Sequence, residues 1–421
     1  MNNKNNRFVI QAFLLLAAIG LSWYFTRPHV GTRRGVDAPA TVSVSRSKAS
    51  ERTAPDPARE RRRQESISLA AQRWYEELLV KYPQMKPTYR DVPDEQNGFL
   101  QFLLLAESLK EPRLPEDLSG MLGSGSGWDA GLFKVWLAEN KDYRDQILHI
   151  AELPDQSIKG LDFDRLAQCC KFSSEFGNIL SGSARLAFEA GDQESALRYS
   201  KASISLSGHL TDIEVPSVLG EVIAAGYRVR VRDSFMENML PILSNDPQTL
   251  VSWREALIRK EAPASEYARV LSGDWNFVMR THVLPALLGG FSSANGEFRI
   301  PDTDAFFDAY TSATQKLAAN LSNSGPERLD LSHSQFEFPE SGIDPKTLEM
   351  LTSTASAYRG IFNALGVHST NTAMISAAVA VQLGEEPGID PVSGKPFQWD
   401  PKSRTLSLPE GVEGYDPIKL R

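Results

Sequence analysis

A helix, a glycine turn and a second helix are predicted between Asn178 and Leu210, and this stretch constrains the fold more than any other. Gly191 is placed to end the first helix in a left-handed conformation, and Asp192 to cap the second. The stretch is therefore predicted to be a helical hairpin rather than an active site. The apolar positions of its first helix recur at helical spacing: Ile179, Leu180, Leu186, Ala187 and Ala190.

Small side chains follow the turn. Ala196, Ser200 and Ser203 lie on one side of the predicted second helix, which favours a close crossing with the first. We expect Ala196 to occupy that crossing, with no room for a larger side chain.

The segment Gly191–Leu197 reads G-D-x-x-x-A-L and resembles one tetratricopeptide-like hairpin. The later aromatic and small positions, Tyr199 and Ala202, stand one residue early, and no clean second copy follows at a period of about 34 residues. Solenoids need several stacked repeats. We therefore favour an irregular helical bundle over a short α-solenoid-like body.

The run Phe8–Phe25 is apolar, contains no charged residue and is long enough to cross a bilayer. It predicts a transmembrane anchor over residues 1–27, with the lipid bilayer as its partner. A cleaved signal peptide is the alternative, but no small-x-small site follows the run. Basic residues lie on both sides of it, so they do not set its orientation. We expect a single-pass inner-membrane protein with its body in the periplasm.

Residues 28–65 are poor in large apolar side chains and are predicted to form a disordered linker. Their basic run, Arg59–Arg63, is explained either as contact with lipid headgroups or nucleic acid, or as a solvated cluster opening the next helix; we favour the solvated cluster. The net charge of -8 argues against a general nucleic-acid binder.

Residues 66–386 are predicted to form a helical domain, as one unit or as two lobes with a seam near 289–301. A flexible loop is expected at Gly120–Gly127, which lacks the lysine of a phosphate-binding loop. Helices are expected over residues 66–82, 93–105, Trp128–Ala151, Leu161–Ala190, Asp192–His209, Glu214–Leu240, Pro247–Lys260, Ala264–Leu271, Asp274–Leu288, Asp302–Leu321, Asp344–Leu365 and Ser369–Leu383.

Metal-binding and catalytic motifs are not found. The six histidines are scattered, and His149 with Glu152 is the one pair of histidine and carboxylate at one-turn spacing, whereas zinc needs three or four ligands. Cys169 and Cys170 are adjacent on a predicted helix and are interpreted as buried structural thiols. We assign no catalytic, cofactor or metal residue.

The C-terminal segment 387–421 changes to turns and short extended pieces, which predict a small β-hairpin from Phe397–Trp399 and Thr405–Leu408. The apolar side chains of this tail, Ile389 among them, are expected to dock it on the helical body. Lys395 is placed to pair with Asp390 across a tight turn. The tail's structural motif is Asp390, Pro391, Gly394, Lys395 and Pro396, followed by Phe397.

Three motifs resemble a group of uncharacterised bacterial proteins with a membrane anchor and a long helical body. They are the V-P-D-E-x-N segment Val92–Asn97, the hairpin motif A-x-x-G-D-x-x-x-A-L around Phe188–Leu197 with Ala187 at its head, and the D-P-x-x-G-K-P-F tail. The resemblance implies the same architecture and no activity, and Tyr415–Arg421 depart from the group's Gly-rich ending.

Two functions are considered. The first is a membrane-tethered binding or scaffold protein that faces the cell envelope and holds a peptide or partner protein in a helix-lined groove. The alternative is a membrane-anchored hydrolase whose catalytic residues are dispersed over the helical body. We favour the binding protein, since no catalytic motif is found.

Overall fold

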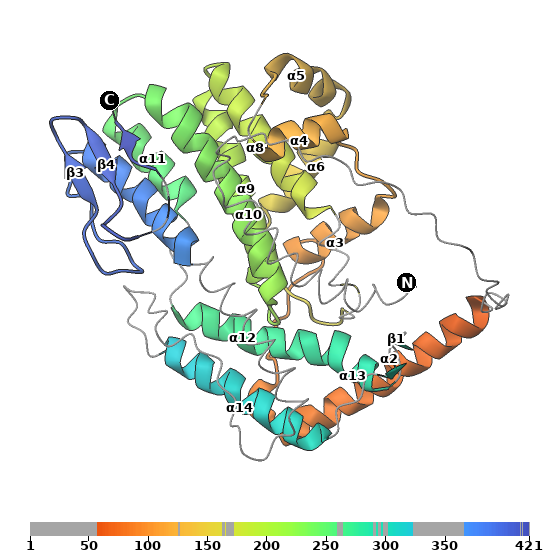
Figure 1. Cartoon of the computed structure of the whole chain (residues 1–421). Coiled ribbons are helices and arrows are strands. Elements are labelled where there is room, and N and C mark those ends of the chain that lie inside the picture. The colour runs from red at the N-terminus through yellow and green to blue at the C-terminus, as the bar shows by residue number, and fades with distance from the viewer. Residues whose placement is uncertain are drawn as a thin grey trace, which may run out of the picture.

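The computed structural model describes residues 57–124, 127–161, 165, 172–258, 264–288, 292–293, 296–297, 302–322, 366–412, 414 and 416–420. Helices dominate these residues, which confirms the mainly helical prediction (Figure 1). The α-helices are α2 (Pro57–Lys81), α3 (Gly98–Ser108), α4 (Glu116–Ser124), α5 (Ala130–Glu139), α6 (Lys141–Ala151), α8 (Ser173–Glu189), α9 (Gln193–Thr211), α10 (Val218–Ser234), α11 (Pro247–Leu257), α12 (Ala264–Val278), α13 (Leu284–Leu287), α14 (Thr303–Ser322) and a helix over 366–382. Shorter helical turns are η1 (Pro83–Met85), η3 (Phe235–Met239), η4 (Leu240–Ile242) and η5 (Met279–Val283).

The helices α8, α9 and α10 pack side by side at the centre, and α3 to α6 cover them (Figure 1). Aromatic rings fill the space between these helices. Phe102 of α3 meets Phe176 of α8 edge to face, with ring centroids 5.0 Å apart, and Tyr143 of α6 contacts the same ring. Burial of such rings and their edge-to-face contacts stabilises this first hydrophobic cluster.

The α8–α9 turn forms as predicted. Gly191 has a φ of 81°, and its N–H donates to the Phe188 carbonyl at 2.9 Å, while the Asp192 N–H donates to the Ala187 carbonyl at 2.9 Å. These two bonds make a Schellman end for α8. The Asp192 carboxylate then accepts from the Ser195 N–H at 3.0 Å and caps α9. Ala196 is completely buried beyond the turn.

A second hydrophobic cluster joins α2, α12 and α14, which form a layer beneath the central helices in Figure 1. Trp275 of α12 is fully buried, and its indole N–H donates to the Thr311 hydroxyl at 3.0 Å. The predicted break between Leu271 and Asp274 is wrong, because α12 runs through Gly273 without interruption. A Cβ there would lie 2.1 Å from the Pro216 carbonyl oxygen, so this glycine allows a close approach rather than a turn.

The predicted β-hairpin is confirmed, with β3 (Gln398–Asp400) antiparallel to β4 (Thr405–Ser407). A third strand, β5 (Ile418–Lys419), pairs with β4 and was not expected, since two residues are too few to show an alternating pattern. A further short pair, β1 (Ser292–Ser293) and β2 (Gly296–Glu297), also escaped prediction.

The C-terminal sheet docks on the helices, as expected. Phe397 is 4% exposed and joins a third hydrophobic cluster with Trp253 of α11 and Phe235 of η3. Ile389 does not contribute to this docking, because it is 64% exposed. Its neighbour Asp390 is turned inward instead. Successive side chains of an extended chain point to opposite sides, so Ile389 is directed outward.

The motif Asp390–Phe397 forms a tight turn around a buried carboxylate. Asp390 accepts from the Thr370 hydroxyl at 2.7 Å and from the Ser393 N–H at 2.6 Å. The expected pair between Asp390 and Lys395 is wrong. The Lys395 ammonium lies 3.4 Å from the Glu410 carbonyl oxygen, because a flexible lysine keeps its charge in water while the buried carboxylate uses closer donors.

Several predicted boundaries also differ. The expected helices 93–105, Leu161–Ala190 and Glu214–Leu240 correspond to helices that begin at Gly98, Ser173 and Val218. The helix α2 begins at Pro57, inside the expected linker 28–65, because proline suits the first helical turn and arginine and glutamate favour helices. Most of Gly120–Gly127 is not a loop, since α4 continues to Ser124 with Met121 buried. The expected helix Trp128–Ala151 is divided at Asn140, whose side-chain amide donates to a carbonyl at the end of α5.

Several predictions fall outside the described residues. They concern the anchor Phe8–Phe25, the linker up to residue 56, the pair Cys169–Cys170, the helix Asp344–Leu365 and most of the seam 289–301. Among the helices that the structure does describe, none is both long enough and apolar enough to span a bilayer.

Candidate functional site

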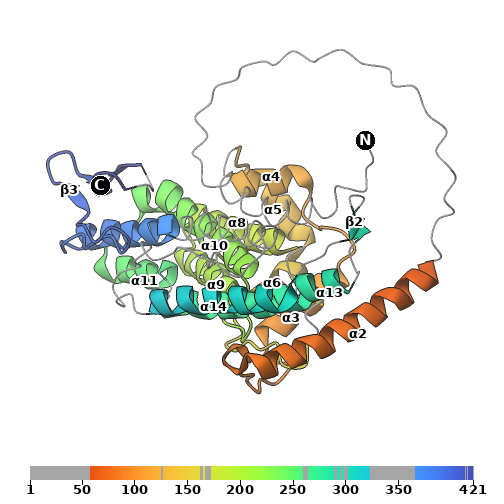
Figure 2. The same ribbon diagram turned by 60° about the horizontal axis from the view of Figure 1, so that its bottom comes forward.

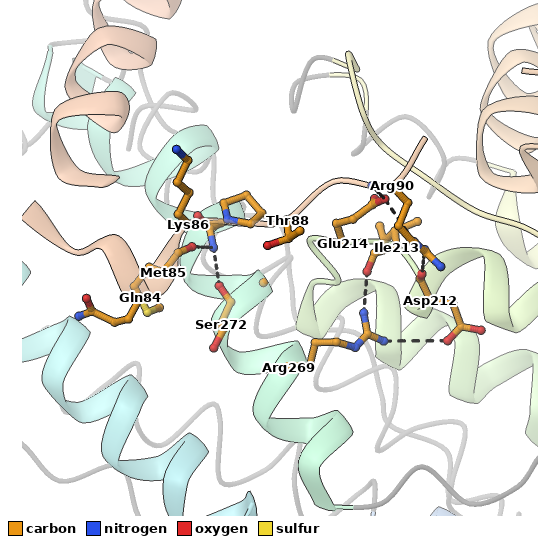
Figure 3. A pocket seen from close by; sticks show the side chains of 13 residues that line it. Gln84, Met85, Lys86, Thr88, Arg90, Asp212, Ile213, Glu214, Arg269 and Ser272 are labelled. Carbon is orange, nitrogen blue, oxygen red and sulfur yellow. Dashed lines mark hydrogen bonds and ion pairs between the residues drawn. The ribbon is translucent and has the colours of Figure 1, made fainter. Parts of the chain in front are cut away.

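A cavity of about 550 Å³ lies beside α12 (Figure 3). Its walls are the segment Gln84–Arg90 after α2, the α9–α10 connection Asp212–Glu214, and α12 from Arg269 to Asn276. Met85 belongs to the second hydrophobic cluster and Ile213 to the first. The cavity therefore lies where two separately packed parts of the molecule meet, which is a common position for binding sites.

Two arginines fix the α9–α10 wall. Arg90 donates through its Nη2 to the carbonyls of Asp212 and Gln156. Arg269 donates to the carbonyls of Ile213 at 2.6 Å and Thr211 at 2.5 Å. The last carbonyls of a helix have no partner within it and carry partial negative charge, so cationic donors suit this end of α9. The wall is held from both sides.

Glu214 is the buried acid of this wall, with a side chain that is 3% exposed. One carboxylate oxygen accepts from the Arg90 N–H at 2.9 Å and from the Ser157 hydroxyl at 2.8 Å, and the other from the Ile158 N–H at 2.9 Å. Burial by itself would raise the pKa of Glu214, but these hydrogen bonds outweigh it and hold the pKa below its usual value. Both carboxylate oxygens of Glu214 are therefore occupied by hydrogen-bond donors of the protein.

Asn97 ties the Val92–Asn97 segment to the same region. Its side-chain oxygen accepts from the N–H groups of Leu100 and Ser157, both at 3.1 Å, so it caps α3 and holds the neighbouring loop together. Its amide donates to the Ser157 carbonyl at 2.8 Å. The asparagine of this motif is therefore a structural residue behind the cavity.

His209 is completely buried beneath this wall. Its Nε2 lies 2.6 Å from the Ile150 carbonyl, which only accepts, and its Nδ1 lies 2.9 Å from the Gln156 amide nitrogen, which only donates. These partners require the neutral ring with the proton on Nε2. The ring also fills the space beside Gly98, where a Cβ would lie 2.5 Å from Nε2.

Asn276 forms the polar side of α12 that faces the cavity. Its amide donates to the Met85 carbonyl at 2.9 Å and to the Ser272 carbonyl at 2.7 Å, and its oxygen accepts from the Tyr75 hydroxyl at 2.5 Å. Burial raises the pKa of Tyr75, so this hydroxyl stays a donor. The segment after α2 is thereby fixed to α12.

Among the remaining polar groups of the cavity, the Lys86 ammonium only donates, while the amide and hydroxyl groups both donate and accept. Gln84, Lys86 and Thr88 are exposed at its rim, and Ser272 lines it from α12. Within the described part of the chain, Arg90 uses its Nε and Nη2 and leaves Nη1 unengaged. Such a set suits a ligand rich in acceptors, namely carboxylates or peptide carbonyls.

The residues singled out from the sequence lie elsewhere. Gly191, Asp192 and Ala196 shape the α8–α9 hairpin, and Asp390, Pro391, Gly394, Lys395 and Pro396 shape the C-terminal turn; none of them lines the cavity. Arg90, Glu214 and Arg269 were not identified as site residues from the sequence. The signal nearest to them was the motif Val92–Asn97, which begins two residues after Arg90.

Among the residues that the structure describes, no group of three or more His, Cys, Asp or Glu side chains is arranged to hold a metal ion. No protein-family model, curated protein or solved structure matches this chain.

Proposed function

We propose that this chain is a membrane-tethered binding protein whose cavity holds an extended, acceptor-rich segment of a partner protein. The observation that carries the proposal is the cavity wall, which Arg90 and Arg269 fix while donors at the rim stay available. A preformed site loses little conformational entropy on binding, and peptide carbonyls and carboxylates match its donors.

The geometry favours binding over hydrolysis. A general base needs a free lone pair and a pKa close to the working pH, whereas Glu214 accepts from several donors and has a lowered pKa. The Asp212 carboxylate lies 4.0 Å from the Arg269 guanidinium and pairs with it.

The tether in this proposal is Phe8–Phe25, an uncharged run long enough for a bilayer. We place the body on the periplasmic side of an inner membrane, because a short head before a single anchor commonly stays inside the cell. The net charge of -8 supports a protein partner rather than nucleic acid.

A photo-reactive amino acid at position 88 tests the cavity as a binding site. In membranes that contain the full chain, we expect a discrete crosslinked protein, and Lys86→Glu should abolish it by placing an anion at the rim. Lys134→Glu is the matched control, an exposed charge reversal on α5 that should leave the product unchanged. Equal crosslinking in both variants would overturn the assignment of the cavity.

A further inference from the structure

The helix α2 forms an outer edge of the molecule, and its N-terminal half projects beyond the packed layer (Figure 2). Ala71, Tyr75 and Leu78 face the second hydrophobic cluster. The opposite face carries arginines together with two large apolar residues that are left exposed, Leu69 and Val80.

Up to Arg73, that face is defined by five exposed positions. At 100° per residue they fall within a stripe about 80° wide on the helix. Leu69 lies at one edge of this stripe and is 60% exposed. The positions are Arg59, Arg62, Ser66, Leu69 and Arg73.

We propose that this face of α2 docks on an anionic lipid surface, so that α2 lies along the membrane and orients the body. This inference rests on the proposed tether. An amphipathic helix with arginines beside an exposed leucine suits the boundary between headgroups and acyl chains. Each basic residue near an anionic surface strengthens the attraction roughly fivefold.

The distribution of charge along α2 selects the end that docks. Arginines outnumber acids in the first half of the helix, where Glu65 is also exposed, whereas the exposed acids Glu76 and Glu77 lie toward its end. The body as a whole is acidic, with a net chain charge of -8, so this local positive patch is the part that a negative surface attracts.

The chain before α2 also points to a membrane as the occupant. Residues 26–56 separate the predicted anchor from Pro57, and a flexible chain of that length spans about 30 Å on average. The start of α2 is therefore kept at a high effective concentration beside the bilayer. A second copy packed symmetrically on this face would bring the same arginines together, and they would repel each other.

A spin label at position 69 tests the inference in the full chain. We would introduce Leu69→Cys with Cys169 and Cys170 replaced by serine, and reconstitute the protein into neutral or anionic phospholipid vesicles. We expect the label to lose accessibility to a water-soluble relaxation agent in anionic vesicles alone. The combined change Arg59→Gln, Arg62→Gln and Arg73→Gln should abolish this loss.

The matched control is a label at Val135→Cys, which is 62% exposed on α5 and should stay accessible in both vesicles. Equal accessibility at position 69 in both vesicles would overturn the inference, and dipolar broadening between labels would assign the face to a second copy instead.

Flotation separates the two proposals. Protein that floats with neutral vesicles supports the tether, protein that floats only with anionic ones supports α2 and refutes the tether, and protein that floats with neither refutes both.

Discussion

At the scale of single residues, two glycines in helices have opposite surroundings and give a direct test of packing. Gly98→Ala would place a Cβ 2.5 Å from Nε2 of His209, whose ring is fixed by two hydrogen bonds. We expect a loss of about 1–3 kcal/mol in the free energy of unfolding, because the ring has no space to move into. Chemical denaturation of both proteins measures it.

Gly120→Ala is the matched control for that change. Gly120 is in α4, and among the described residues no atom outside the adjoining turns of that helix lies within 4 Å of its added Cβ. Replacing a glycine within a helix should stabilise the protein by about 0.5–1 kcal/mol. A destabilisation of similar size in both variants would contradict this account of Gly98.

The carboxylate of Glu214 gives a prediction about pH. Its pKa is lowered in the folded chain from the ordinary 4.5, so the stability that it contributes is complete above pH 4.5 and is lost as the pH falls through the folded value. Glu214→Gln should therefore be less stable at neutral pH and show a shallower loss of stability below pH 4.5. Urea unfolding across this range measures it, and Glu139→Gln, an exposed residue, should keep the original slope.

At the scale of elements, the C-terminal sheet should act as a docked part of the fold. Phe397→Ala removes a ring that is 4% exposed and should destabilise the protein by about 3–5 kcal/mol. Ile389→Ala changes a side chain that is 64% exposed and should have little effect. Thermal unfolding compares the two, and equal midpoints would show that the sheet is loosely attached.

Elements with strong local signals were predictable from the sequence. The glycine and aspartate of the α8–α9 turn act through their own backbone, so Gly191 and Asp192 behave as expected. Gly273 does not end a helix as predicted, because its role is set by Pro216, which is distant in sequence. The candidate site was not predictable for the same reason: Arg90, Glu214 and Arg269 meet only after α2, α9 and α12 have packed, and no local pattern records such a contact.

At the scale of the whole molecule, membrane association should depend on two regions in different ways. A spanning helix resists salt and alkaline extraction, whereas an electrostatic contact weakens as salt screens the charges. The full chain should thus stay with membranes under both treatments, because Phe8–Phe25 is the run long and apolar enough to cross.

Deletion of residues 1–27 separates these contributions. The shortened chain should remain folded, since α2 and its packing against α12 and α14 lie beyond the deletion. It should bind anionic membranes weakly at low salt through the arginines of α2, and be released as the ionic strength rises above about 0.15 M. Fractionation at two salt concentrations, with circular dichroism of the released protein, tests both statements. A full-length chain recovered entirely in the soluble fraction would refute the tether, and a shortened chain that resists salt would show that a membrane contact lies in the body.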